Sequence, residues 1–94
     1  MNKEISETQF EEASEIFKVL ANVTRLKILV GIMHDECNVS KIVEKLGLPQ
    51  STISQHLTTM RNKGIIKGRR QGAKVCYTIV DKKARILVSI LQNW

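Results

Sequence analysis

Apolar residues recur at helical spacing in the first third of the chain. A stripe over 6–20 predicts one helix, and Ser6 followed by Gln9 fits a capping box at its start. A second helix is predicted over 22–34. The apolar faces consist of Phe10, Ala13, Ile16, Phe17 and Leu20 in the first helix, and of Leu26, Leu29, Val30 and Met33 in the second.

The middle of the chain has the spacing of two short helices joined by a tight turn. Residues 36–40 read as an extended segment, and Ser40 is expected to cap the helix that follows. Gly47 stands where a left-handed residue is favoured, and Pro49 suits the first turn of the next helix. That helix, over 50–62, has a narrow apolar seam of Ile53, Leu57 and Met60.

After Gly64 the pattern changes from helical to alternating, which predicts a hairpin with strands over 65–70 and 74–80. Gly68 and Gly72 would give this hairpin freedom to bend. In the second strand Val75, Tyr77 and Ile79 share one face, and Lys74, Cys76 and Thr78 share the other. Asp81 is then expected to cap a last helix over 82–94.

The predicted order is α-α-β-α-α-β-β-α, a mainly α (α+β) arrangement that describes a winged helix-turn-helix. We predict a single domain over 1–94, with the helix-turn-helix at about 40–63 and the wing at about 65–80. Because a chain of 94 residues buries only a thin core, self-association is expected.

The charge is unevenly divided along the chain. Residues 1–50 contain six basic and eight acidic residues, whereas 51–94 contain nine basic residues and a single acid, Asp81. Six of the basic residues lie between Arg61 and Lys74. Such a cluster is typical of nucleic-acid binding, although a solvated basic face would look the same.

The outer face of the helix over 50–62 has the side chains that a DNA-reading helix needs. Short Ser and Thr allow close approach, Gln pairs with adenine, and Arg pairs with guanine. Gln55, Thr59 and Thr52 are predicted to read bases. The residues assigned to positioning on the backbone are Lys63, Lys67, Arg70 and Lys74. The full predicted DNA-binding set is Gln50, Ser51, Thr52, Ser54, Gln55, His56, Thr59, Arg61, Lys63, Lys67, Arg69, Arg70 and Lys74.

Other classes of protein have little support in the sequence. No nucleophile and base, paired carboxylates or glycine-rich phosphate loop suggest an enzyme, and no catalytic residue is predicted. No apolar run is long enough to cross a membrane, and the polar opening does not resemble a signal peptide, so a cytoplasmic protein is expected. A winged-helix module that binds proteins is the remaining alternative.

The stretches 17–32 and 46–79 resemble the second helix, the recognition helix and the wing of the ArsR/SmtB repressors. This resemblance covers most of the chain. The resemblance implies a homodimer that binds a palindromic operator in double-stranded DNA and is usually released by an inducer. It also implies dimerisation through the first and last helices, at about 6–20 and 82–94. The dimer residues expected there are Phe10, Phe17, Ile86, Leu87, Ile90 and Trp94.

The sequence departs from the metal sites of that family and resembles its branches without metal ligands. Where the arsenic and cadmium branch has Cys-Val-Cys, this chain has Asn38, Val39 and Ser40, and neither Asn nor Ser is a soft ligand. The last helix, where the zinc branch has His and acidic ligands, contains no His, Asp, Glu or Cys over 82–94. We therefore predict no metal and no cofactor, and the inducer stays unknown.

Cys37 and Cys76 are too few for a disulfide scaffold. If the short strand pairs with the second wing strand, the two cysteines are neighbours. Strand alternation then argues against a bond, because Cys37 shares its face with Val39 and points inward, whereas Cys76 points outward. Cys37 is thus predicted to be a small buried hydrophobic residue. A thiol- or redox-responsive repressor that uses both cysteines is the alternative.

Overall fold

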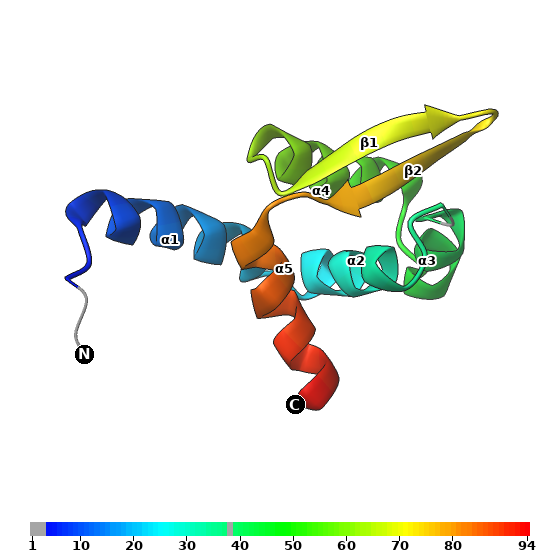
Figure 1. Cartoon of the computed structure of the whole chain (residues 1–94). Coiled ribbons are helices and arrows are strands. Elements are labelled where there is room, and N and C mark those ends of the chain that lie inside the picture. The colour runs from blue at the N-terminus through cyan, green and yellow to red at the C-terminus, as the bar shows by residue number, and fades with distance from the viewer. Residues whose placement is uncertain (1–3, 38) are drawn as a thin grey trace.

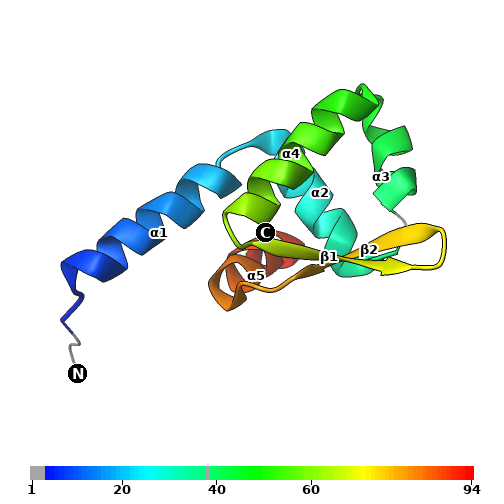
Figure 2. The ribbon, with the colours of Figure 1, turned by 90° about the horizontal axis from the view of Figure 1, so that it is seen from above.

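The computed structural model describes residues 4–37 and 39–94, and within them it contains five α-helices and one antiparallel hairpin. Figure 1 shows α1 reaching out from a body made by the other elements, and Figure 2 shows the same projection from above. The elements are α1 (Glu7–Leu20), α2 (Val23–His34), α3 (Val39–Leu46), α4 (Gln50–Asn62), β1 (Ile66–Gln71), β2 (Lys74–Ile79), α5 (Lys82–Ser89) and a short 3₁₀ helix (Ile90–Asn93).

Local capping residues begin the helices where the sequence predicts. The Ser6 backbone N–H donates to Gln9 Oε1 at 2.8 Å, and the Gln9 backbone N–H donates to Ser6 Oγ at 3.2 Å, which completes the capping box. At α5 the Ala84 backbone N–H donates to Asp81 Oδ1 at 2.9 Å. Both predicted caps are confirmed, because each depends only on residues three positions apart.

The core surrounds α2, which packs against α1, α3, β2 and α5. Ile28, Leu29 and Ile32 are almost completely buried. Of the predicted α2 face only Leu29 is fully buried, and the other three residues pack against the edge of the core. The predicted face was wrong because a central helix is covered on several sides and so has no single apolar stripe.

The predicted extended segment over 36–40 is wrong. Glu36 and Cys37 lie in a turn, and α3 already begins at Val39. The turn is stabilised by the Cys37 backbone N–H, which donates to Asp35 Oδ1 at 3.2 Å. Asn38 and the Ser40 side chain lie outside the described residues. One strand-like contact remains, in which the Tyr77 N–H donates to the Glu36 carbonyl oxygen at 2.8 Å.

The structure also corrects the prediction for the two cysteines. Cys37 and Cys76 form a disulfide, with Cα atoms 4.1 Å apart. Cys76 is buried, whereas Cys37 is partly exposed. The alternation argument assumed two extended strands. Because Cys37 lies in a turn, the alternation of side chains along a strand does not decide where its side chain points. The same turn covers the face of β2 that was expected to meet solvent.

The last helix is shorter than predicted. Regular α-helix ends at Ser89, whose hydroxyl donates to the Ile86 carbonyl oxygen at 2.7 Å, and residues 90–93 continue as a 3₁₀ helix. Such side-chain bonds to the preceding turn compete with the helical pattern. Within the described residues, no helix combines the length and the apolar character that a membrane span requires.

Replacement of a central core residue should destabilise this small fold strongly. Ile28 is 0% exposed, so Ile28→Ala should lower the free energy of unfolding by about 2–5 kcal/mol through lost contacts and a cavity. Urea denaturation at fixed protein concentration measures the change. Val23→Ala is the matched control, since Val23 is 68% exposed and should change stability by no more than about 0.5 kcal/mol.

Candidate nucleic-acid interface

The polar face of α4 is held outward by its apolar seam. Ile53, Leu57 and Met60 are buried in the core, as the sequence predicts. Because all three residues at this spacing are buried, the rotation of α4 about its own axis is fixed, and Gln55 points to solvent. The other exposed members of the predicted set on α4 are Gln50, Ser51, Ser54 and Arg61, while Thr52, His56 and Thr59 are partly buried.

The turn before α4 sets its angle to α3. Gly47 has a φ of +63°, a conformation that favours glycine. Pro49 follows as the residue at the N-terminal boundary of α4, and its carbonyl oxygen accepts from the Thr52 and Ile53 N–H groups. Proline cannot cap a helix with its side chain, so the first N–H groups of α4 are left to other partners.

Arg25 is a positioning residue that the sequence did not single out. Its Nε donates to the Val19 carbonyl oxygen at 2.7 Å, and its Nη2 donates to the Lys18 carbonyl oxygen at 3.4 Å. Its Nη1 lies 3.5 Å from Nδ1 of His56 in α4. Arg25 therefore joins the end of α1 to the recognition helix through side-chain contacts that local patterns do not reveal.

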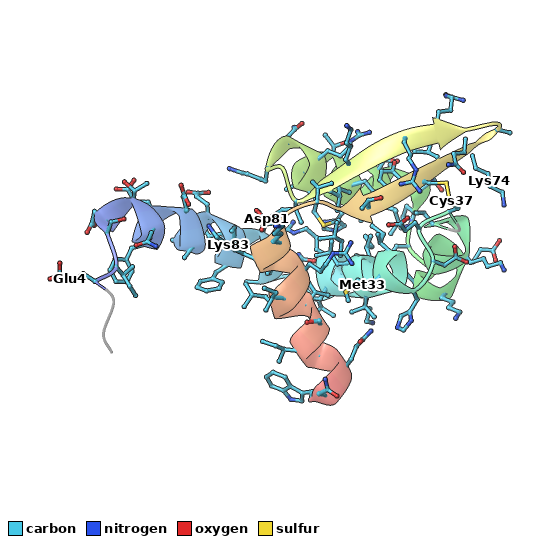
Figure 3. All side chains as sticks on the ribbon, viewed as in Figure 1. Glu4, Met33, Cys37, Lys74, Asp81 and Lys83 are labelled. Atoms are coloured by element: carbon cyan, nitrogen blue, oxygen red, sulfur yellow. A yellow bond between two sulfur atoms is a disulfide. The ribbon has the colours of Figure 1, made fainter. Side chains whose placement is uncertain are left out.

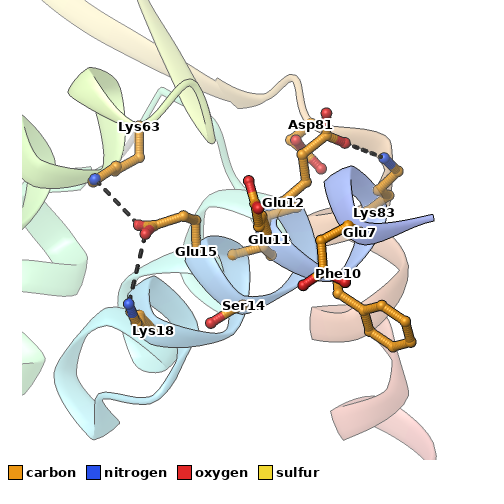
Figure 4. Close-up of a pocket in the computed structure, with 11 residues that line it drawn as sticks. Glu7, Phe10, Glu11, Glu12, Ser14, Glu15, Lys18, Lys63, Asp81 and Lys83 are labelled. Carbon is orange, nitrogen blue, oxygen red and sulfur yellow. Dashed lines mark hydrogen bonds and ion pairs between the residues drawn. The ribbon is translucent and has the colours of Figure 1, made fainter. Parts of the chain in front are cut away.

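Lys63, at the end of α4, is held by an acid of α1. Its Nζ lies 3.4 Å from Glu15 Oε2, and Lys18 Nζ lies 3.6 Å from Glu15 Oε1 (Figure 4). The positive charges of Lys18 and then Lys63 hold the pKa of Glu15 below its ordinary value. Lys63 therefore already shares its charge with a carboxylate, which weakens its prediction as a dedicated phosphate contact.

The wing is a regular hairpin whose faces differ. Gly68 lies opposite Tyr77, and a Cβ at Gly68 would come within 3.2 Å of the Tyr77 ring. Gly68 thus makes room for a ring that packs on the core, rather than giving the hairpin freedom to bend. Gly72 has a φ of +62° in the two-residue turn, where that freedom is required.

The cations of the wing are exposed, and one of them is paired. Lys67, Arg70 and Lys74 face solvent, and Figure 3 places Lys74 toward the tip of the hairpin. Arg69 is exposed as well, but its guanidinium has partners within the chain. Its Nη2 lies 3.2 Å from Glu36 Oε1, and its Nη1 donates to Thr78 Oγ1 at 2.6 Å.

The ion pair of Arg69 joins the wing to the turn between α2 and α3. The hydrogen bond from Arg69, followed by one from Thr78, holds the pKa of Glu36 below its ordinary value. The Glu36 side chain is 37% exposed, so the pair is screened by solvent. The structure therefore assigns Arg69 a protein partner that the basic cluster of the sequence did not suggest.

The residues predicted to form a dimer are largely uncovered in the single chain. Phe10, Phe17, Ile86 and Ile90 are between 48% and 63% exposed, and Trp94 is 92% exposed. A hollow of about 240 Å³ between α1 and α5 is lined by Ala13, Ile16, Phe17, Lys83, Ile86 and Leu87. Within the part of the chain that the structure describes, no three His, Cys, Asp or Glu residues gather as a metal site would require.

A polar recognition helix beside a basic wing is the arrangement of a DNA-binding regulator, and the sequence comparison agrees. The pattern of the family described as bacterial regulatory protein, arsR family, matches residues 22–67. The transcriptional repressor PagR of Bacillus anthracis is 37% identical over 92 residues, which cover 97% of this chain and 92% of PagR. The chain therefore belongs to the ArsR family of transcriptional regulators, which confirms the predicted resemblance.

Solved structures agree with the fold. The crystal structure of PagR matches with a TM-score of 0.78 and covers 92% of this chain and 99% of that one. HlyU from Vibrio cholerae, named a transcriptional activator, is 31% identical over 93 residues, which cover 99% of this chain and 86% of HlyU. Its structure matches with a TM-score of 0.85, at 30% identity and over 94% and 96% of the two chains. The winged helix-turn-helix is thereby confirmed, and the relatives include both a repressor and an activator.

The Glu36–Arg69 pair should contribute to stability only where Glu36 is ionised. Because the folded pKa lies below the ordinary value of 4.5, the contribution is complete above that value and is lost as pH falls through the folded pKa. Glu36→Gln should cost about 0.5 kcal/mol at neutral pH and less at a pH well below 4.5, where the carboxylate becomes protonated. Urea denaturation at both pH values measures this, and a cost that does not change with pH would rule out the charged pair.

Proposed function

We propose that the protein represses transcription as a homodimer that places α4 of each protomer in the major groove of a palindromic operator. The observation that carries this proposal is the acid-free face of α4, which the burial of Ile53, Leu57 and Met60 directs to solvent. Side chains without negative charge approach phosphates without repulsion, and their donors and acceptors suit base edges.

The apolar residues of α1 and α5 support the dimer. Phe17 and Ile86 are both more than half exposed, and they flank the same hollow. A second copy would bury this hydrophobic surface, which a single small domain leaves in water. A two-fold dimer of this class places its recognition helices about 34 Å apart, one turn of DNA.

The contacts divide into base reading and backbone positioning. Gln55, with Thr52 and Thr59 beside it, would meet base edges, because these residues lie on the outer side of α4. Lys67 and Arg70 of the wing would contact phosphates on the flanking backbone, as would Lys74. His56 has a structural role through Arg25, and Lys63 divides its charge between Glu15 and DNA.

Salt dependence separates DNA binding from binding to a protein partner. Fluorescence anisotropy with a random duplex of about three helical turns measures the affinity over a range of salt concentrations. Lys67→Gln should lower the slope of log K against log salt by about 0.9 per protomer, because one phosphate contact is lost. Lys27→Gln, an exposed change on α2, is the matched control and should leave the slope unchanged.

Three outcomes of the salt titration would contradict the proposal. Absence of binding to the duplex would contradict DNA binding and favour a module that binds another protein. Binding without salt dependence would contradict the proposed contacts to phosphates. A slope that responds equally to Lys67→Gln and Lys27→Gln would contradict the assignment of the wing.

A further inference from the structure

A disulfide joins the turn between α2 and α3 to the wing. Cys37 and Cys76 are 39 residues apart in sequence and come from different elements (Figure 3). The turn leads directly into α3, the first helix of the helix-turn-helix, while Cys76 lies in β2 opposite Arg69 of β1. The bond therefore links the two parts of the molecule that would hold DNA.

Polar contacts accompany the bond at the neighbouring residue. The Glu36 carbonyl oxygen accepts from the Tyr77 N–H at 2.8 Å, and the Glu36 carboxylate pairs with Arg69 at 3.2 Å. Glu36 and Cys37 together attach the turn to both strands of the hairpin. The disulfide therefore lies one residue away from the carboxylate that pairs with the Arg69 guanidinium.

The two cysteine residues differ in exposure. Cys76 is 1% exposed, whereas Cys37 is partly exposed. Cys37 is therefore the cysteine at which we expect a small reagent to attack. Gln71 Oε1 lies 3.9 Å from the Cys76 sulfur, where it can accept from the thiol once the bond is broken.

We propose that Cys37 and Cys76 form a reversible thiol–disulfide exchange site that controls whether Arg69 is available to DNA. The reactant is a low-molecular-weight thiol in the direction of reduction and the corresponding disulfide in the direction of oxidation. The inference rests on the proposed DNA binding and adds a regulatory reaction to it.

The exchange is balanced by two molecules of thiol. The thiolate of the first attacks the Cys37 sulfur, the bond between the cysteines breaks, and Cys76 leaves as a thiolate that takes up a proton. The second thiol attacks the outer sulfur of the mixed disulfide and releases Cys37 as a thiol. Two electrons and two protons pass to the protein, and the two reagent molecules leave joined as a disulfide.

Reduction changes the charge that the wing presents. Exposed ion pairs are weak, so without the covalent bond the Glu36–Arg69 contact is open to competition from phosphate. In the oxidised protein Glu36 neutralises Arg69, and the wing lacks that cation. In the reduced protein Arg69 makes one additional phosphate contact per protomer, and the affinity for DNA rises.

The experiment compares oxidised protein with protein reduced by dithiothreitol, with the same random duplex over a range of salt concentrations. Mass spectrometry after thiol alkylation verifies each state. The reduced protein should bind more tightly at low salt, and its slope should be steeper by about 0.9 for each released arginine, or about 1.8 for a dimer. Glu36→Gln should give the oxidised protein the slope of the reduced one.

Two further variants test the route through Arg69. Cys37→Ser with Cys76→Ser should behave as reduced protein and should not respond to dithiothreitol, and reduction of the unchanged chain provides the same test if that variant fails to fold. Arg69→Gln should remove the difference in slope between the redox states.

Each contrary result has a distinct meaning. Equal affinity and slope in the two redox states, with salt-dependent binding in both, would overturn the exchange site and leave the proposed function intact. Two free thiols after treatment with oxidised glutathione would also overturn it. Absence of salt-dependent binding in either state would overturn the proposed function itself.

Discussion

Burial of the apolar seam of α4 is the constraint on which the site depends. Ile53, Leu57 and Met60 lie in the core, and they fix both the depth and the rotation of the helix. Gly47 and Arg25 then adjust its position, the first through the preceding turn and the second through His56. The polar face of α4 points to solvent because its three apolar residues lie on the opposite side of the helix and are buried in the core.

The balance of charge in the folded chain differs from the balance along the sequence. The sequence divides into an acidic first part and a basic second part, but the fold brings acids of the first part onto cations of the second. Glu15 meets Lys63, Glu36 meets Arg69, and Glu12 lies 3.6 Å from Lys83. Among the described residues, no ion pair neutralises Lys67, Arg70 or Lys74 of the hairpin, so positive charge remains where a wing contacts the DNA backbone.

The sequence predicts the parts of this structure that depend on nearby residues. The capping box at Ser6, the cap at Asp81 and the glycine at Gly47 each act over a few positions, and all are confirmed. The same is true of the seam of α4. The sequence pattern argued against the disulfide, which was kept only as an alternative, and it did not single out the Arg25–His56 contact. Both depend on how distant segments meet, which the spacing of neighbouring residues does not show. The contacts of the predicted DNA-binding residues with DNA remain a prediction.

Selection of bound sequences from a pool of random duplexes tests the central claim most directly. If two copies of α4 read adjacent major grooves, the selected sequences should share two inverted half-sites with centres about 10 base pairs apart. When the same selection is carried out with the Gln55→Ala variant, the selected sequences should lose the base preference at defined positions of each half-site. Enrichment of a single unpaired site, or of no sequence at all, would contradict a dimer that reads an operator through α4.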